Sequence, residues 1–319
     1  MTRREIIGRA GLAPLAFSLG CSRSSKKVIG VVPMGRSHVF WQSVHAGAID
    51  AARELDVEIS WNGPANESEF NAQIQIVDAM ITRRVDAICL APIDRDALSN
   101  VVNRAAAAGI PVVIFDSPIK TDKFVAQIAT DNYFAGGLAA DRMGEILQGK
   151  GEVVIVAVQV GSASTNAREK GFADVIARKF PGIKILDKRY GNANYAESLK
   201  VAENMLTAHP KLDGIFASNE SSTAGAVQAL KGRKSKAKLV GFDSSEPLLA
   251  DLEAGVIDSL VTQHPFQTGH ESVVAAVKAM RGQAVERIQN IAPLVVTTAN
   301  LKDPVVQARI RPDLKKYLP

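Results

Sequence analysis

Two stretches of the chain repeat each other: Val85-Asp86-Ala87-Ile88 leads to Phe115-Asp116-Ser117, and Leu212-Asp213-Gly214-Ile215 leads to Phe242-Asp243-Ser244. Thirty positions separate the two aspartates within each stretch, and the second stretch lies 127 positions after the first. In both stretches a short apolar run ends in Phe-Asp-Ser. This equal spacing indicates that one structural unit is duplicated within the chain.

Apolar runs and helical segments alternate around these stretches. Strands are predicted at 28–33, 57–61, 85–91, 111–116, 153–158, 183–190, 212–218 and 238–243. Helical periodicity lies between them, at 40–55, 67–84, 97–108, 166–179, 195–208 and 222–230. Continuous Val and Ile runs are typical of strands that are buried on both faces, as in parallel sheets covered by helices. We therefore predict an α/β protein with two similar doubly wound parallel-sheet lobes joined by hinge strands.

Asp116 and Asp243 each follow a predicted strand, in equivalent positions of the two lobes. Ligands of open parallel sheets bind beyond the carboxyl ends of the strands. Where those ends face each other, each lobe contributes one carboxylate to a shared cleft. The alternative is that each aspartate only caps the segment that follows it.

Composition limits the classes of protein to which the chain can belong. Of its 319 residues, 46% are hydrophobic and 22% are charged, which suits a folded protein with a substantial core. The sequence has no apolar run of the roughly 18–20 residues that a membrane-spanning helix needs. The net charge is +5, part of which comes from Arg3, Arg4 and Arg9 in the leader. We therefore expect no nucleic-acid partner.

The first 21 residues have the pattern of a bacterial signal peptide. Arg3 and Arg4 stand in a stretch that resembles a twin-arginine export signal, and the apolar segment 10–20 is too short to span a membrane. Cys21 ends this segment as in a lipoprotein cleavage site, so we expect lipid on Cys21, followed by a tether at 22–27. The alternative is an unprocessed cytoplasmic N-terminus. The other cysteine, Cys89, lies in an apolar strand and is predicted to be buried.

From about residue 27 to its end, the chain resembles the type I periplasmic binding proteins of bacterial ABC importers, in particular their ribose-binding-like branch. The order and spacing of several stretches carry the resemblance, among them Ile110-Pro111-Val112-Val113-Ile114-Phe115-Asp116, Ala167-Arg168-Glu169-Lys170-Gly171-Phe172 and Ile215-Phe216-Ala217-Ser218-Asn219-Glu220. It implies an N-terminal lobe of 28–130 plus 264–292 and a C-terminal lobe of 131–263 plus 293–319. The hinges are then expected near 130–131, 263–264 and 292–293.

Carried over position by position, the sugar contacts of that family fall on Phe40, Trp41, Asp116, Arg168, Asn219, Asp243 and Gln263, with His38 and Ser117 beside them. Carboxylates accept hydroxyl protons, a guanidinium donates, amides do both, and aromatic faces cover the C–H side of a sugar ring. Ser117 stands where ribose binders place Arg, and His38 stands near a family Asn. The family's second-lobe aromatic falls near Ala193-Asn194. These differences point to a sugar or polyol other than ribose.

The resemblance implies a solute-binding protein without catalysis, cofactor or metal, which delivers a sugar or related polyhydroxylated molecule to an inner-membrane ABC permease. It further implies a monomer in the periplasm or cell envelope, in contact with the membrane only through a lipid anchor on Cys21. One alternative is a periplasmic sugar sensor that presents its closed form to a chemoreceptor or kinase. A weaker one is a glycan-active enzyme that uses Asp116 and Asp243 as its acid and base. A repressor with this two-lobed sensor would need a helix-turn-helix domain ahead of it, where this chain has a leader.

Structural roles compete with several of these assignments: a hydrophobic contact for Phe40 and Trp41, an ion pair with Glu169 or Asp174 for Arg168, a helix cap for Asn219 and a hinge position for Gln263. The run 144–151 has nearly the spacing of a phosphate-binding loop, but such a loop follows a strand and opens a helix. We interpret 144–151 as a helix end and turn. The five histidines lack a metal-binding spacing.

Overall fold

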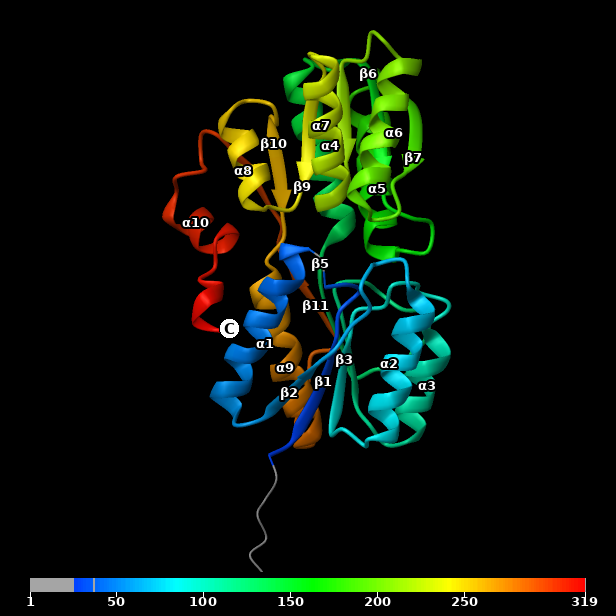
Figure 1. Cartoon of the computed structure of the whole chain (residues 1–319), viewed down its shortest axis with the longest axis vertical. Helices are drawn as coiled ribbons and strands as arrows, with labels where there is room; N and C mark the ends of the chain where they lie inside the picture. The colour runs from blue at the N-terminus through cyan, green and yellow to red at the C-terminus, as the bar shows by residue number, and fades with distance from the viewer. Residues whose placement is uncertain (1–25, 37, 319) are drawn as a thin grey trace, which may run out of the picture.

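The computed structural model describes residues 26–36 and 38–318, which form two α/β lobes placed end to end (Figure 1). The first lobe is built on a six-stranded sheet with the strand order β11-β5-β4-β3-β1-β2. All neighbouring strands in it pair in parallel. Its strands are β1 (Val28–Val32), β2 (Glu58–Trp61), β3 (Ala87–Leu90), β4 (Val112–Phe115), β5 (Ala126–Thr130) and β11 (Ile288–Ile291).

The second lobe repeats this arrangement, with the strand order β12-β10-β9-β8-β6-β7. Only the pairing of β12 with β10 is antiparallel among the described strands of this sheet. Its strands are β6 (Lys150–Ala157), β7 (Gly182–Tyr190), β8 (Gly214–Ala217), β9 (Lys238–Phe242), β10 (Ser259–Thr262) and β12 (Leu294–Thr297). The two orders correspond strand by strand, so the predicted fold of two similar doubly wound lobes is confirmed.

Helices cover both faces of each sheet (Figure 1). In the first lobe, α1 and α9 pack on one face, and α2 and α3 pack on the other. In the second lobe, α4 and α5 cover one face, and α6, α7, α8 and α10 cover the other. The helices are α1 (Val39–Leu55), α2 (Phe70–Thr82), α3 (Ser99–Ala107), α4 (Asn132–Ile146), α5 (Ala163–Lys179), α6 (Tyr195–Ala208), α7 (Glu220–Arg233), α8 (Glu246–Glu253), α9 (Pro265–Met280) and α10 (Pro304–Ile310).

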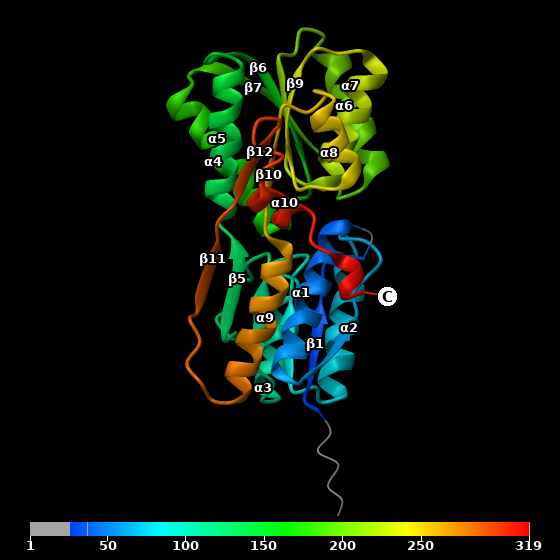
Figure 2. The ribbon, with the colours of Figure 1, turned by 90° about the vertical axis from the view of Figure 1, so that its left-hand side faces the viewer.

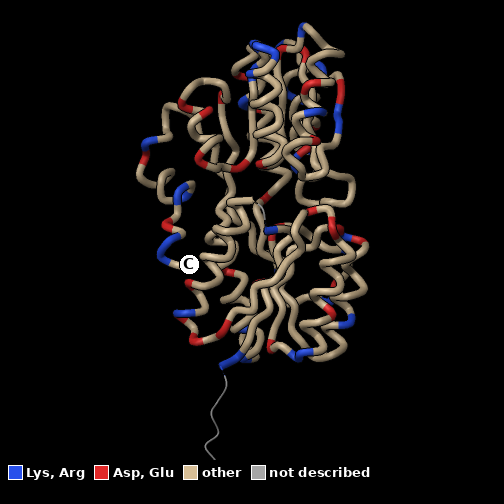
Figure 3. The backbone as a smooth tube through the Cα atoms, viewed as in Figure 1, with Lys and Arg blue, Asp and Glu red and all other residues tan. Residues whose placement is uncertain are grey.

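Central strands are buried along their whole length, as the Val and Ile runs of the sequence predict. Every residue of β3, β4, β8 and β10 is buried, whereas the edge strands β2 and β7 are partly exposed. Cys89 of β3 lies in the first-lobe core as a free thiol, which confirms its predicted burial. The described part of the chain contains no helix that is long and apolar enough to cross a bilayer. Lysines, arginines and acidic residues are interspersed over both lobes (Figure 3).

Paired glycines allow one helix pair in each lobe to approach closely. A Cβ at Gly47 of α1 would lie 1.9 Å from the carbonyl oxygen of Phe266, and one at Gly269 of α9 would lie 2.0 Å from that of Val44. The α4–α5 pair of the second lobe has the same arrangement at Gly136 and Gly171. These glycines are therefore required by helix packing and not by their backbone angles.

Three connections join the lobes in the middle of the molecule. The chain passes from β5 to α4, from β10 to α9, and from β11 to β12. A fourth contact comes from residues 311–318, which we call the C-terminal strap. It leaves α10 on the second lobe and reaches the first lobe beside α1 (Figure 2), where the Arg53 guanidinium donates to the carbonyl of Lys316 at 3.2 Å.

The predicted element bounds differ from the observed ones mainly at helix starts. The helix predicted from residue 67 begins at Phe70, because Pro64 and the Glu69 carboxylate, which accepts from Asn66, hold the preceding residues in a loop. The strand predicted from residue 153 begins at Lys150. Gly149, with φ 76°, separates it from α4, so the interpretation of 144–151 as a helix end and turn is confirmed.

Candidate functional site

Asp116 and Asp243 occupy corresponding turns of the two lobes. Asp116 follows β4 and Asp243 follows β9, both in the left-handed region with φ of 61° and 67°. Each backbone N–H donates to the neighbouring strand at 2.9 Å, Asp116 to Ile128 and Asp243 to Val261. Aspartate tolerates this conformation better than most residues because its short polar side chain bonds locally. Both carboxylates line one cavity between the lobes.

This interlobe cavity is small and is lined mainly by polar and aromatic side chains. Its volume is about 30 Å³, and both lobes contribute to its lining: Met34, His38, Phe40, Trp41, Glu67, Asp116, Ser162, Ser164, Thr165, Arg168, Asn219, Asp243 and Gln263. Phe40, Asp243 and Gln263 also border a second cavity of about 250 Å³ beneath the C-terminal strap. Because a volume of about 30 Å³ holds no more than about one water molecule, a solute of the size of a sugar fits between the lobes only when they separate.

Eight of the nine predicted ligand contacts line the interlobe cavity, namely His38, Phe40, Trp41, Asp116, Arg168, Asn219, Asp243 and Gln263. Ser117 does not line it. The Ser117 side chain points toward the second lobe, where its hydroxyl accepts from the backbone N–H of Ser164 at 3.2 Å. Ser117 is 1% exposed, and this hydrogen bond joins the two lobes beside the cavity.

Arg168 is held in place by groups of the second lobe. Its Nε donates to Asn132 at 2.7 Å, one terminal nitrogen donates to the carbonyl of Ser218 at 3.0 Å, and the guanidinium lies 4.1 Å from the ring centre of Phe242. The alternative of an ion pair with Glu169 or Asp174 is wrong. Those carboxylates pair with Lys188 and Lys170.

The two aspartates share the positive charge of Arg168. Burial raises the pKa of the Asp116 carboxyl to about 7, against the opposing effect of Arg168. Burial also raises the pKa of Asp243, while Arg168 and the amide of Gln263, which donates to Asp243 at 2.7 Å, act in the opposite direction. A single guanidinium therefore does not fully compensate the two buried carboxylates.

His38 and Glu67 form a buried ion pair at the wall of the cavity. The Nδ1 atom of His38 lies 2.7 Å from Oε1 of Glu67, which also accepts from the indole N–H of Trp41 at 2.7 Å. Burial alone would lower the pKa of His38, but the Glu67 carboxylate raises it to about 9. Burial would raise the pKa of Glu67, but His38 and Trp41 hold it below its usual value. His38 is therefore a cation near neutral pH.

Several predicted residues have a structural role as well as a place in the lining. The amide oxygen of Asn219 caps α7 by accepting from the N–H of Ser222 at 2.9 Å, which confirms the helix-cap alternative for this residue. Gln263 accepts from the hydroxyl of Thr130 at 3.0 Å and so ties two interlobe connections together. Trp41 packs in the first-lobe core, edge-on to the ring of Phe115. Each of these residues therefore lines the cavity and stabilises the fold at the same time.

Glu67 and a polar run of the second lobe also line the cavity, although they are not among the predicted contacts. The sequence predicts Glu67 within a helix, but it follows β2 in a loop at the carboxyl edge of the sheet. Ser162, Ser164 and Thr165 lie between β6 and the body of α5, which is the position that parallel sheets use for ligands. Tyr195 directly follows Ala193-Asn194, where the family's second-lobe aromatic is expected to fall. Its ring lies edge-on to His38 at 5.2 Å.

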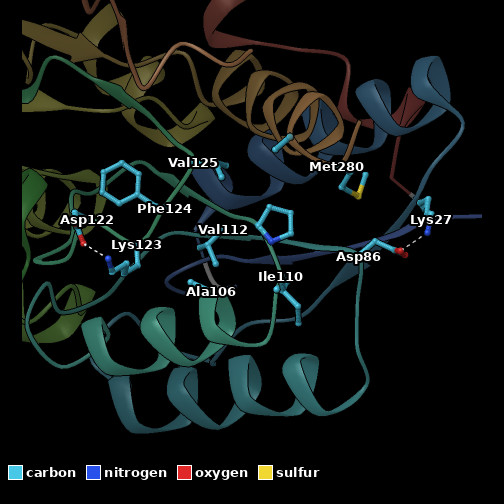
Figure 4. Close-up of a pocket in the computed structure, with 13 residues that line it drawn as sticks. Lys27, Asp86, Ala106, Ile110, Val112, Asp122, Lys123, Phe124, Val125 and Met280 are labelled. Carbon is cyan, nitrogen blue, oxygen red and sulfur yellow. Dashed lines mark hydrogen bonds and ion pairs between the residues drawn. The ribbon is translucent and has the colours of Figure 1, made fainter. Parts of the chain in front are cut away.

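Other hollows of the molecule lie away from these converging groups. A hollow of about 550 Å³ opens at the far end of the first lobe, where Lys27 pairs with Asp86 and Lys123 with Asp122 (Figure 4). On the outside of α1 and α9, the side chains of Asp50, Glu54 and His270 bring three potential metal ligands within 4.8 Å of one another. The Nε2 atom of His270 lies 3.1 Å from a carboxylate oxygen of Glu54 there.

Residues 29–284 match the family described as periplasmic binding protein domain. The chain belongs to this family. A putative rhizopine-binding protein of Rhizobium meliloti is 32% identical over 267 residues, which are 81% of this chain and 85% of the relative. The ribose import binding protein of Bacillus subtilis is 27% identical over 296 residues, 92% of this chain and 95% of the relative.

Solved structures of the family superpose closely on both lobes. A carbohydrate transporter solute-binding protein of Agrobacterium radiobacter, in complex with D-arabinose, has a TM-score of 0.87 and 31% identity, and covers 91% of this chain and 100% of its own. An ABC transporter solute-binding protein of Agrobacterium vitis with bound D-fucose has a TM-score of 0.86 and 32% identity, and covers 89% of this chain and 99% of its own. These relatives are binding proteins and not enzymes, and membership of the family fits a periplasmic location.

Proposed function

We propose that this protein is the solute-binding component of an ABC importer, which captures a sugar or related polyhydroxylated small molecule between its lobes and delivers it to a membrane permease. One observation carries the proposal. Asp116, Arg168 and Asp243 converge, buried, on one cavity between two lobes whose close structural relatives bind D-arabinose and D-fucose. The proposed location is the periplasm, and the proposed form is a monomer.

The cavity offers what a polyhydroxylated solute requires. Each sugar hydroxyl both donates and accepts, so Asp116 and Asp243 take its protons while Arg168 donates to its lone pairs. The amide of Asn219 and the hydroxyls of the 162–165 run add neutral partners. The rings of Phe40 and Trp41 offer an apolar surface to the C–H side of the ring. Charge-assisted hydrogen bonds of about 1.5–3 kcal/mol each, less desolvation and closure, are compatible with micromolar affinity.

Binding without catalysis is expected to proceed by closure of the lobes. The solute enters while the lobes are apart, and the three connections act as hinges. Closure adds the groups of the second lobe to the solute and forms bonds between the lobes, such as that from Gln159 to the carbonyl of Glu67 at 3.0 Å. The solute favours the closed form only by its better contacts there. The permease then recognises that form.

A thermal-shift screen followed by calorimetry tests this function. The mature protein is screened against pentoses, hexoses, polyols and cyclitols, and we expect at least one to raise the melting temperature and to bind with a micromolar dissociation constant. Recovery of that compound unchanged, checked by NMR, distinguishes binding from catalysis. Failure of every class to bind would overturn the proposal, and conversion of the compound would favour the glycan-active alternative.

We also propose export and lipidation of the leader, whose predicted Cys21 lies outside the described residues. In cells labelled with a palmitate analogue, the wild-type protein is expected in the membrane fraction with label, and Cys21→Ser in the soluble fraction without it. Replacing Arg3 and Arg4 with Lys is expected to block export. Unlabelled wild-type protein would contradict the lipid anchor, and normal export of the double variant would contradict the twin-arginine route.

A further inference from the structure

Carboxyl groups outnumber cations around the interlobe cavity. Glu67, Asp116 and Asp243 line it, and the buried carboxyl of Glu220 lies close enough to interact electrostatically with Asp243 and His38. Within the described residues, the cations that line the cavity are His38 and Arg168. Four carboxyls therefore face two cations in a region that water barely reaches.

Most of these groups already have partners. The charge of His38 is compensated by Glu67 at 2.7 Å, and Asp243 accepts from Gln263 and from the N–H of Glu220. Glu220 accepts from the hydroxyl of Tyr195 at 3.0 Å. Glu67, Asp243 and Glu220 therefore each have a hydrogen-bond donor, while the surplus of negative charge around the cavity remains.

Asp116 is the exception. It is 6% exposed and lines the cavity, but among the described residues no hydrogen bond reaches its carboxylate. Arg168 acts on this carboxylate only electrostatically, because its Nε and one terminal N–H donate to Asn132 and Ser218. Ser117, directly after Asp116, is neutral and does not line the cavity, and its hydroxyl bonds to the N–H of Ser164 in the other lobe. A buried carboxylate without a partner is costly unless the solute supplies one.

We propose that the solute of this protein is an amino-bearing polyol, an amino sugar or aminocyclitol, whose ammonium group binds Asp116. The inference rests on the proposed function and names the substrate class of the same site. An ammonium supplies the missing positive charge and three donors, while the remaining hydroxyls of the solute bind Arg168, Asn219 and Asp243. A neutral sugar donates one hydroxyl to Asp116 but leaves the surplus charge, and a sugar acid adds to it.

Matched sets of solutes test whether the amino compound binds more tightly than the neutral sugar, and the neutral sugar more tightly than the sugar acid. Calorimetry compares D-glucosamine with D-glucose and D-glucuronate, an aminocyclitol with myo-inositol, and amino derivatives of the tightest neutral binder from the screen. We expect the best amino compound to bind about tenfold to a hundredfold more tightly than its neutral counterpart, as one charge-assisted hydrogen bond gives. The acid is expected to bind most weakly. Equal or weaker binding of every amino compound overturns the inference but leaves the proposed function standing, whereas binding of none overturns both.

Two variants test whether the Asp116 carboxylate causes the preference for amino over neutral solutes. In Asp116→Asn, which retains the shape and the left-handed conformation but not the charge, the ratio of amino to neutral affinity is expected to fall to within about threefold of unity, whatever happens to each affinity alone. Glu286→Gln removes an exposed carboxylate far from the cavity and is the charge-matched control, with the wild-type ratio expected. A wild-type ratio in Asp116→Asn would overturn the assignment of the ammonium to this carboxylate. If binding to that variant is too weak for direct calorimetry, competition experiments at millimolar solute give the same ratio of amino to neutral affinity.

Discussion

Arg168 turns its backbone carbonyl toward Gly136, so that a Cβ at position 136 would lie 1.9 Å from that oxygen. The close approach of α4 and α5 therefore fixes where the Arg168 guanidinium enters the cavity. Gly136→Ala is expected to lower the free energy of unfolding by about 1–3 kcal/mol, because the helices must move apart. It should also weaken solute binding, since Arg168 moves with α5. Urea unfolding and calorimetry measure the two effects.

Gly232 is the matched control for this substitution. It lies in α7, is exposed, and has no heavy atom within 4 Å of the position of an added Cβ among the described residues. Gly232→Ala is expected to raise stability by about 0.5–1 kcal/mol and to leave binding unchanged, because alanine is the better helix former. Equal effects of the two substitutions would contradict the assigned role of the α4–α5 contact.

The fold was predictable because its signals are local and repeated. Buried parallel strands such as β3 and β8 require unbroken apolar runs, and these are visible in the sequence without knowledge of their neighbours. The duplicated Phe-Asp-Ser turns then place Asp116 and Asp243 at equivalent strand ends. The C-terminal strap was not predicted, because short polar segments such as 311–318 have no periodicity that indicates which lobe they contact.

The site was predictable only where a residue stands at a strand end. Asp116 and Asp243 follow directly from that rule, but the partners of Arg168 do not, because Asn132 and Ser218 come from elements brought together only by the fold. The pairing of His38 with Glu67 joins two loops 29 positions apart and depends on loop conformation. Charge balance in a cavity is a property of such pairings, so the preference for an ammonium group could not be inferred from the list of residues.

Removal of the Asp116 charge is expected to separate stability from binding. In Asp116→Asn, heat stabilisation by the solute from the screen should fall strongly, because the loss of a charge-assisted bond of about 1.5–3 kcal/mol weakens binding about tenfold to a hundredfold. The solute-free protein should gain stability at pH 8, by about 2–4 kcal/mol, and match the wild type at pH 4. The folded pKa of about 7 lies above the unfolded value, so ionisation of Asp116 destabilises the wild type as the pH rises through this range. Retained solute stabilisation would contradict the placement of Asp116 in the site.

The buried pair of His38 and Glu67 predicts a second dependence on pH, at the alkaline side. Because the folded pKa of His38 is about 9 and its unfolded value 6.5, its contribution to stability is complete below pH 6.5 and is lost as the pH rises through 9. The loss is expected to be roughly 3 kcal/mol in the wild type. His38→Gln lacks this charge and should show a flatter curve between pH 6.5 and 9. Melting temperatures across that range compare the two proteins, and parallel curves would exclude a charged His38.

The C-terminal strap predicts an effect on closure that does not involve the solute contacts. Tyr317 of the strap packs against Phe266 of α9 with ring centres 5.3 Å apart, so the closed lobes are bridged at their side as well as at their hinges. Deletion of residues 313–319 keeps α10 but removes this bridge, and should weaken solute binding about threefold to tenfold by favouring the open form, a difference of roughly 1 kcal/mol.

Calorimetry gives the change in affinity, and small-angle X-ray scattering gives the accompanying increase in the radius of the solute-free protein. Lys302→Gln is the control. Lys302 is exposed on the second lobe just before α10 and outside the strap, so its replacement should leave both measurements unchanged. If the shortened chain binds as tightly as the full one, the strap does not contribute to closure, and the balance between open and closed forms is set by the three hinge connections and the cavity alone.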